Sequence, residues 1–288
     1  GISATDESPN NASQAVMRTE DIEIQLLLEA IYLQYGYDFR SYAKASVKRR
    51  ILHRLAMSGM SDISSLQHRI LVEKPFFESL LLDLSINVTE MFRDPTFYKA
   101  LRSEVVPTLR TYPFIRIWVA GCASGEEVYS LAILLMEEGF GNRFQIYATD
   151  FNEVVLRKAK EGIYPIGKIR EYTSNYQKAG GLETFSDYYT AHYDSVIMSQ
   201  ALKERVVFSS HNLATDSVFN EMQLISCRNV LIYFDRNLQN RVLNLFQDSL
   251  CRGGFLCLGK KETLQFSDCD PNFEGVVNSE KIYQKKTG

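Results

Sequence analysis

The chain has 288 residues, of which 45% are hydrophobic and 23% are charged, as in an ordinary globular protein. Its net charge of −3 argues against a dedicated nucleic-acid binder, and no apolar run reaches the roughly 20 residues that span a bilayer. The five cysteines form no CxxC pair and their number is odd, so we expect buried free thiols, a cytoplasmic location and no metal site.

The first third of the chain is predicted to be helical. Residues 1–17 are polar and rich in turn-forming types, and we expect a disordered leader there. Four later stretches carry apolar residues at helical spacing: one begins at Asp21, and the others span about 42–58, 62–73 and 75–84. Residues 18–84 are therefore predicted to form a small all-helical domain, followed by a linker over 85–113.

Apolar strands alternate with helical segments from residue 114 to residue 288. Strands are predicted over 115–120, 144–150, 222–227 and 255–259, and the intervening helices end near residues 138, 161 and 250. The pair Gly253-Gly254 is expected to form a turn. This alternation is typical of an α/β fold with a parallel, doubly wound sheet. Residues 172–207, rich in Tyr, Thr, Val and Ser, interrupt it and are predicted to form a small antiparallel insertion.

Two features at the predicted strand ends indicate a nucleoside ligand. Gly121 and Gly125 follow the first strand and allow a tight turn close to a ligand, and their GxxxG spacing does not indicate a pyrophosphate. Asp150 ends the second strand, where a carboxylate can accept hydrogen bonds from ribose hydroxyls. Together they favour S-adenosylmethionine over NAD. The plainer alternatives are a helix-start turn at the glycines and a helix N-cap at Asp150.

Polar residues follow apolar strands at other points as well. Arg228 and Asn229 leave the strand 222–227, where a buried charge needs a partner; the alternative is a surface turn with Arg228 in solvent. Tyr233 is either part of the same site or a core residue. Asn212-Leu213 follows the strand VVFSS. Residues 87–95 are interpreted as a segment that folds over the cofactor, or as a plain linker with a capped helix start.

These segments form five motifs in a fixed order. They are Asn87-x-Thr89-x-x-Phe92-Arg93-Asp94, Gly121-Cys-Ala-Ser-Gly-Glu-Glu-Val-Tyr-Ser130, Ala148-Thr-Asp150, His211-Asn-Leu213 and Cys227-Arg-Asn-Val-Leu-Ile-Tyr-Phe234. With them the chain resembles the CheR family of chemotaxis receptor methyltransferases, from about Asp21 to Tyr283. The resemblance implies a small N-terminal helical domain, a linker, and a Rossmann-like methyltransferase domain that carries a small antiparallel β subdomain.

The resemblance also implies roles for individual residues. Cofactor contacts are expected at Asn87, Thr89, Arg93, Glu127, Asp150, Asn212, Leu213, Arg228 and Asn229. Arg93 and Tyr233 are expected to orient a glutamate of a chemotaxis receptor beside the methyl group of S-adenosylmethionine. Because that carboxylate is already ionised at neutral pH, no general base is needed, and catalysis should consist of positioning. The expected products are a glutamate methyl ester and S-adenosylhomocysteine.

A basic segment fits such a substrate. Arg40, Lys44, Lys48, Arg49, Arg50 and Arg54 occur without an intervening acid. Alone, the run is interpreted as a solvated helix face; with the resemblance, Lys44, Lys48, Arg49, Arg50 and Arg54 are predicted to dock onto the acidic methylation helices of a receptor.

The stretch 188–196 lacks the glycine-rich loop of relatives that bind a receptor pentapeptide. A monomer is expected, with no nucleic-acid partner and no membrane insertion.

Two rival hypotheses are compatible with parts of the sequence. A nucleic-acid methyltransferase would use the basic helix for phosphates, but the pI is near 5.9 and no NPPY-like tetrapeptide follows the strand 222–227. A non-catalytic module that senses S-adenosylmethionine would be favoured if Arg93 or Tyr233 were missing, and both are present.

Overall fold

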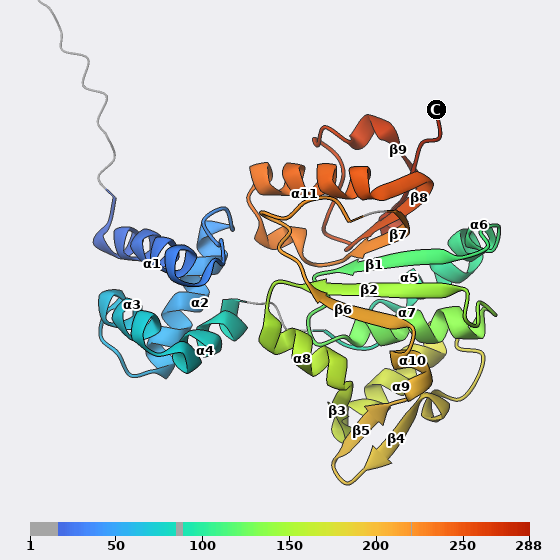
Figure 1. The fold of residues 1–288 in the computed structure, drawn as a ribbon, viewed down its shortest axis with the longest axis horizontal. Helices are drawn as coiled ribbons and strands as arrows, with labels where there is room; N and C mark the ends of the chain where they lie inside the picture. Colours follow the sequence, from blue (N-terminus) through green and yellow to red (C-terminus); the bar gives the residue numbers. More distant parts are fainter. Residues whose placement is uncertain (1–16, 85–88, 220) are drawn as a thin grey trace, which may run out of the picture.

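The computed structural model describes residues 17–84, 89–219 and 221–288. Residues 1–16 of the predicted leader and the predicted cofactor contact Asn87 lie outside the described residues. Four helices form the N-terminal unit, as predicted: α1 (Thr19–Tyr35), α2 (Lys44–Met57), α3 (Ile63–Val72) and α4 (Lys74–Leu84). In Figure 1 they form a separate bundle beside the sheet.

Local chemistry accounts for the helix boundaries of this bundle. Gly36 has a φ of 79° and ends α1 in the left-handed conformation that glycine adopts without strain. Asp62 caps α3, because its carboxylate accepts a hydrogen bond of 2.7 Å from the backbone N–H of Ser65. Apolar side chains from all four helices, among them Leu27, Ile51, Leu66 and Leu80, are fully buried in one core. The bundle therefore has a hydrophobic core of its own.

The second unit is built on a seven-stranded sheet with the order β6-β2-β1-β7-β8-β10-β9. Its strands are β1 (Ile115–Ala120), β2 (Phe144–Asp150), β6 (Val206–Ser210), β7 (Met222–Cys227), β8 (Leu250–Leu258), β9 (Phe273–Val277) and β10 (Ile282–Lys285). The first five are parallel, whereas β10 runs antiparallel to both β8 and β9. The α/β fold is confirmed, and the predicted parallel sheet carries one antiparallel strand, β10, near its C-terminal edge.

The turn expected at Gly253-Gly254 is also wrong, because both glycines lie inside β8. The register between β7 and β8 passes from Met222↔Leu250 to Leu224↔Phe255, so β8 bulges at this point. Gly253 has a φ of 77°, which a bulge of this kind requires and an L-residue rarely adopts. A glycine pair in a strand pattern is ambiguous between a turn and a bulge.

Helices cover both faces of the sheet. Ile117 and Val119 of β1 pack toward α7 (Glu126–Glu137), while Trp118 and Ala120 pack toward α11 (Arg236–Ser249). The helix α8 (Glu153–Glu161) contacts β2 and β6. The described part of the predicted linker is not a loose connection. It forms α5 (Pro95–Ala100), a π-helical turn (Leu101–Val105) and α6 (Val106–Leu109), whose apolar side chains join the core beside α7.

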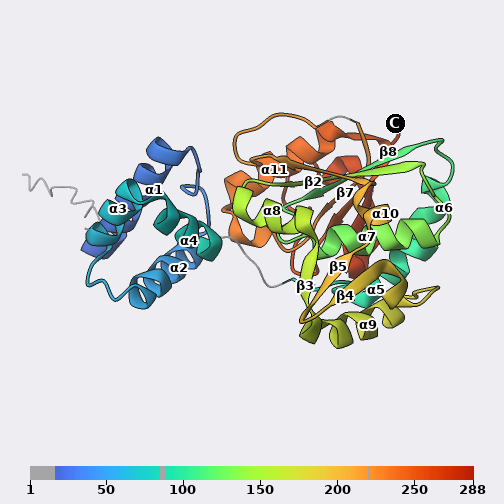
Figure 2. The ribbon, with the colours of Figure 1, turned by 60° about the horizontal axis from the view of Figure 1, so that its bottom comes forward.

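A small antiparallel sheet projects from this unit, as Figures 1 and 2 show. Its order is β3-β5-β4, with β3 (Ile163–Pro165), β4 (Tyr189–His192) and β5 (Ser195–Met198). The predicted antiparallel insertion exists, but its first part is the helix α9 (Ile169–Lys178), and β6, at the end of the predicted range, belongs to the main sheet.

Glu137 ties this small sheet to the rest of the unit. Its carboxylate is fully buried and accepts hydrogen bonds from Arg102 at 2.7 Å, from the hydroxyl of Tyr188 at 2.7 Å, from the hydroxyl of Tyr176 and from the N–H of Leu182 at 3.0 Å. These bonds join α7 to the segment that precedes β4.

The two units meet along a short stretch of paired backbone. Tyr42 and Phe234 form an antiparallel bridge, flanked by hydrogen bonds from Ala43 N to Tyr233 O at 2.7 Å and from Asp235 N to Ser41 O at 2.9 Å. The rings of Tyr42 and Phe234 lie 4.9 Å apart. Among the described residues, no helix is long and apolar enough to cross a membrane.

Candidate functional site

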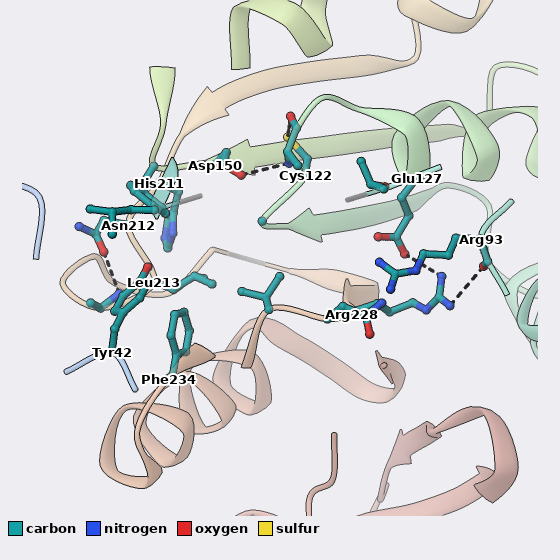
Figure 3. A pocket seen from close by; sticks show the side chains of 18 of the residues that line it. Tyr42, Arg93, Cys122, Glu127, Asp150, His211, Asn212, Leu213, Arg228 and Phe234 are labelled. Atoms are coloured by element: carbon teal, nitrogen blue, oxygen red, sulfur yellow. Dashed lines mark hydrogen bonds and ion pairs between the residues drawn. The ribbon is translucent and has the colours of Figure 1, made fainter. Parts of the chain in front are cut away.

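A cleft lies where the carboxyl ends of β1, β2 and β7 face the helical unit (Figure 3). The space between its lining atoms, open solvent included, is about 1020 Å³. Eight of the nine predicted cofactor contacts line it: Thr89, Arg93, Glu127, Asp150, Asn212, Leu213, Arg228 and Asn229. The ninth is Asn87. Parallel strands explain this convergence, because their carboxyl ends share one edge of the sheet.

The turn after β1 forms the floor of the cleft. Gly121 has a φ of 71°, and a Cβ atom at this position would lie 2.7 Å from a methyl of Val230. Gly125 has a φ of 93° and packs against Ala159 and the hydroxyl of Tyr164. Larger residues would be strained and would clash, so the turn needs both glycines. Cys122 and Ala123, between them, line the cleft.

Asp150 is buried at the end of β2. Its carboxylate accepts hydrogen bonds from Ala123 N at 3.0 Å and from Asn152 N at 2.9 Å. Burial raises its pKa to about 6, against the opposing effect of these bonds. The alternative that Asp150 caps the next helix is wrong, because Asn152 is the N-cap of α8 and accepts from Val154 N and Val155 N. A carboxylate held this way can still accept hydrogen bonds from a diol.

One end of the cleft is charged (Figure 3). The guanidinium of Arg228 is 3.1 Å from the carboxylate of Asp94 and 3.6 Å from that of Glu127, and it stacks on the ring of Phe97 at 3.8 Å. The Arg228 side chain is only 3% exposed, so the surface-turn alternative is wrong. Glu127 also accepts a hydrogen bond of 2.7 Å from Ser226. With Arg93, this end presents both signs of charge, as the amino-acid part of a zwitterionic ligand requires.

The opposite end is lined by aromatic and apolar side chains. Tyr42 of the helical unit lies beside Leu213 and Phe234 of the sheet unit, and Leu84 of the helical unit also lines the cleft. Tyr42 was not predicted as a site residue, because only the docking of the two units brings it to the cleft. His211 lies beside them, with its Nε2 atom 3.1 Å from Ser217 O and its ring edge against Trp118. A planar heterocycle fits such a wall.

Local hydrogen bonds fix two of the polar loops. Asn212 accepts from Ala214 N at 2.9 Å and donates its own N–H to Asp216 at 2.9 Å. Asn229 has a φ of 63°, and its N–H donates to the carboxylate of Glu262 at 2.7 Å. Glu262 was not singled out from the sequence, since no spacing rule connects it to a loop about 30 residues away.

Tyr233 is not among the residues that line the cleft. Its ring lies under the guanidinium of Arg50, 5.0 Å from the centroid, where the helical unit meets the sheet unit. Tyr233 therefore stands at the border between the cleft and the basic helix α2, next to the lining residue Phe234.

The basic residues of α2 are not equivalent. Lys48 pairs with Glu20 and Asp21, Arg54 pairs with Asp83, and Arg50 donates to the carbonyl oxygens of Asp83 and Leu84. Lys44 and Arg49 are exposed, and neither forms an ion pair within the described part of the chain. The positive surface that α2 offers to a partner therefore centres on these two side chains.

Comparison with known proteins matches both units. The family described as "CheR methyltransferase, all-alpha domain" matches residues 22–85, and the one described as "CheR methyltransferase, SAM binding domain" matches residues 87–279. The chain is 55% identical over 268 residues to Cher3 of Pseudomonas putida, covering 93% of this chain and 98% of that protein.

Less similar relatives are named chemotaxis protein methyltransferases. A chemotaxis protein methyltransferase of Borreliella burgdorferi is 30% identical and covers 84% of this chain and 88% of its own length. The one from Escherichia coli is 26% identical and covers 91% and 90%. A solved SAM-dependent methyltransferase from Geobacter sulfurreducens, in complex with S-adenosyl-L-homocysteine, is 15% identical with a TM-score of 0.33; the match covers 60% of this chain and 51% of that structure.

Proposed function

This chain belongs to the CheR methyltransferase family, and on that premise we propose that it transfers the methyl group of S-adenosylmethionine to glutamate side chains of chemotaxis receptors. Its second unit is the S-adenosylmethionine-binding domain of the family. The observation that carries the finer proposal is a single cleft with three chemically distinct parts, bordered by a helix with exposed cations.

The three parts fit the three parts of the cofactor. The aromatic end with Tyr42, Leu213 and Phe234 suits the adenine, and the buried carboxylate of Asp150 suits the ribose hydroxyls. The charged end with Arg93 and Glu127 suits the amino-acid group, whose carboxylate and ammonium need partners of opposite sign.

When bound, the cofactor supplies an electrophilic methyl group on a sulfonium. A carboxylate oxygen of the acceptor forms the new O–CH₃ bond as the C–S bond breaks, and the bonding electron pair stays on sulfur. No proton is transferred, since the acceptor is ionised at neutral pH. The protein's contribution is then to position the acceptor in line and to exclude water.

We assign that positioning to Arg93 and Tyr233. Arg93 lines the cleft at its charged end, and Tyr233 stands between the cleft and α2, so an acceptor helix docked on α2 would reach the cleft past Tyr233. Replacement of Tyr233 by Phe keeps the ring under Arg50. We expect it to lower kcat about tenfold, by the loss of one hydrogen bond to a charged group, and to leave cofactor affinity unchanged.

The direct test is methyl transfer to a receptor. The protein is incubated with methyl-labelled S-adenosylmethionine and membranes that contain chemotaxis receptors of the source organism. Label should enter receptor bands and leave as methanol at high pH, because a carboxyl methyl ester is base-labile. Label that is stable to base would indicate methylation of nitrogen, and label in nucleic acid would support the rival phosphate-binding hypothesis. Cofactor binding without any transfer would indicate a sensor.

A further inference from the structure

The loop after β7 is held by one buried carboxylate. Glu262 is 4% exposed and accepts four backbone hydrogen bonds: from Asn229 N and Gly259 N at 2.7 Å on one oxygen, and from Val230 N and Ile232 N at 3.1 Å on the other. Glu262 forms no ion pair within the described part of the chain. A cradle of backbone N–H groups is a sufficient partner for a buried anion.

The loop held in this way lines the cleft. Arg228, Asn229 and Val230 line the cleft directly, and Asn229 adopts a left-handed backbone conformation that needs support from its surroundings. A few residues later, the same segment forms the backbone pairing with residues 41–43 that places Tyr42 at the aromatic end.

From this geometry we infer that Glu262 is a positioning residue for cofactor binding: it sets the places of Arg228 and Asn229 at one end of the cleft and, through the backbone pairing at Phe234, of Tyr42 at the other. This inference rests on the placement of the cofactor proposed above. Glu262 itself does not line the cleft, so it acts through the backbone that it holds.

A second buried carboxylate in the same unit provides a control that distinguishes a positioning role from an effect on stability alone. The side chain of Glu137 is also buried and accepts four hydrogen bonds, one of them from Arg102, but it holds the small antiparallel sheet and lies outside the cleft lining. Glu262→Gln and Glu137→Gln each place an amide NH₂ group where only an acceptor fits. Both substitutions should lower Tm, but only Glu262→Gln should change the geometry of the cleft.

The experiment is calorimetric titration of the full chain with S-adenosylmethionine, well below the Tm of every variant. We expect Glu262→Gln to bind at least about tenfold more weakly than wild type, since the lost bonds are to a charged group, and Glu137→Gln to bind within about twofold. Equal affinity of Glu262→Gln and wild type would overturn the inference. So would a loss of affinity in Glu137→Gln as large as that in Glu262→Gln.

A second variant disturbs the cradle without changing the carboxylate. A Cβ atom at Gly259 would lie 2.4 Å from Asn229 Oδ1 and 2.8 Å from Glu262 Oε1, so Gly259→Ala should push the loop aside and weaken binding as Glu262→Gln does. It replaces Glu262→Gln if the latter fails to fold, and unchanged affinity in Gly259→Ala then overturns the inference. Failure of wild type to bind the cofactor, by contrast, would contradict the placement of the cofactor and not the role of Glu262.

Discussion

The cleft and helix α2 both carry cations, but the two regions surround them differently. In the cleft, the Arg228 side chain is 3% exposed and lies between Asp94, Glu127 and the ring of Phe97. On α2, Lys44 and Arg49 face solvent. A buried cation with fixed partners has a defined position at a large desolvation cost, whereas an exposed one is mobile and screened by salt. The first arrangement suits the fixed geometry of a reaction, and the second suits attraction of a partner.

The largest expected effect is the loss of the buried cation. Arg228→Met would remove the buried guanidinium that pairs with both Asp94 and Glu127. We expect the free energy of unfolding to fall by about 3–5 kcal/mol and cofactor binding to be lost, because breaking a buried pair leaves an uncompensated charge. Denaturant unfolding and calorimetric titration measure the two quantities.

An exposed arginine provides the matched control. Arg110 is 47% exposed in its ion pair with Glu138, and Arg110→Met should change stability by less than about 1 kcal/mol without affecting the cleft. If the two variants lost similar amounts of stability, the distinction between buried and exposed cations in this protein would be unsupported.

A smaller effect is expected from protonation of Asp150. Burial raises its pKa to about 6 in the cofactor-free protein, and ribose hydroxyls that donate to the carboxylate would favour the anion and lower that pKa. Binding would then release a proton, so affinity for S-adenosylmethionine should fall up to about tenfold per pH unit below pH 6. Titrations between pH 5 and 7.5 measure this slope.

Protonation of Asp150 should affect folding stability in the opposite direction from cofactor affinity. Because the folded pKa lies above that of the unfolded chain, the stabilising contribution of protonated Asp150 is complete at low pH and is lost as the pH rises through about 6. Burial also raises the pKa of Glu126 to about 6, but Glu126 does not line the cleft. Asp150→Asn retains Glu126 and should bind about 30-fold more weakly with no slope near pH 6, since one charged acceptor is lost. A slope that persists in Asp150→Asn would assign it to another group.

Much of this site could be predicted from sequence, because its residues stand at strand ends. Gly121, Asp150 and Arg228 follow apolar strands that the pattern identifies, and parallel pairing then brings them to one edge. The resemblance added Thr89 and Glu127, which the spacing alone did not assign. Tyr233 does not line the cleft and its ring lies under Arg50, so its role in orienting the acceptor stays a prediction.

Other features depend on tertiary contacts that local patterns do not encode. Tyr42 reaches the cleft only through pairing with Phe234, and Glu262 supports a loop that is distant in sequence. The edge strand β9 was missed because it is short and its first four residues include Glu274 and Gly275, which interrupt a strand pattern. The ion pairs of Lys48 and Arg54 with acidic residues of neighbouring helices could likewise not be predicted, because they form only when the helices pack together.

The smallest effect, and the sharpest test of the comparison, concerns the exposed cations. Lys44→Glu combined with Arg49→Glu should raise the apparent KM for a receptor fragment about tenfold at low salt, because two attractive charges become repulsive, while kcat and cofactor affinity stay unchanged. The difference from wild type should shrink as salt is raised. The double reversal of Arg116 and Lys286 to Glu, both exposed and away from the cleft lining, changes the net charge equally and should leave KM near that of wild type. Equal increases in KM for the two double variants would mean that overall charge, and not the surface of α2, attracts the receptor.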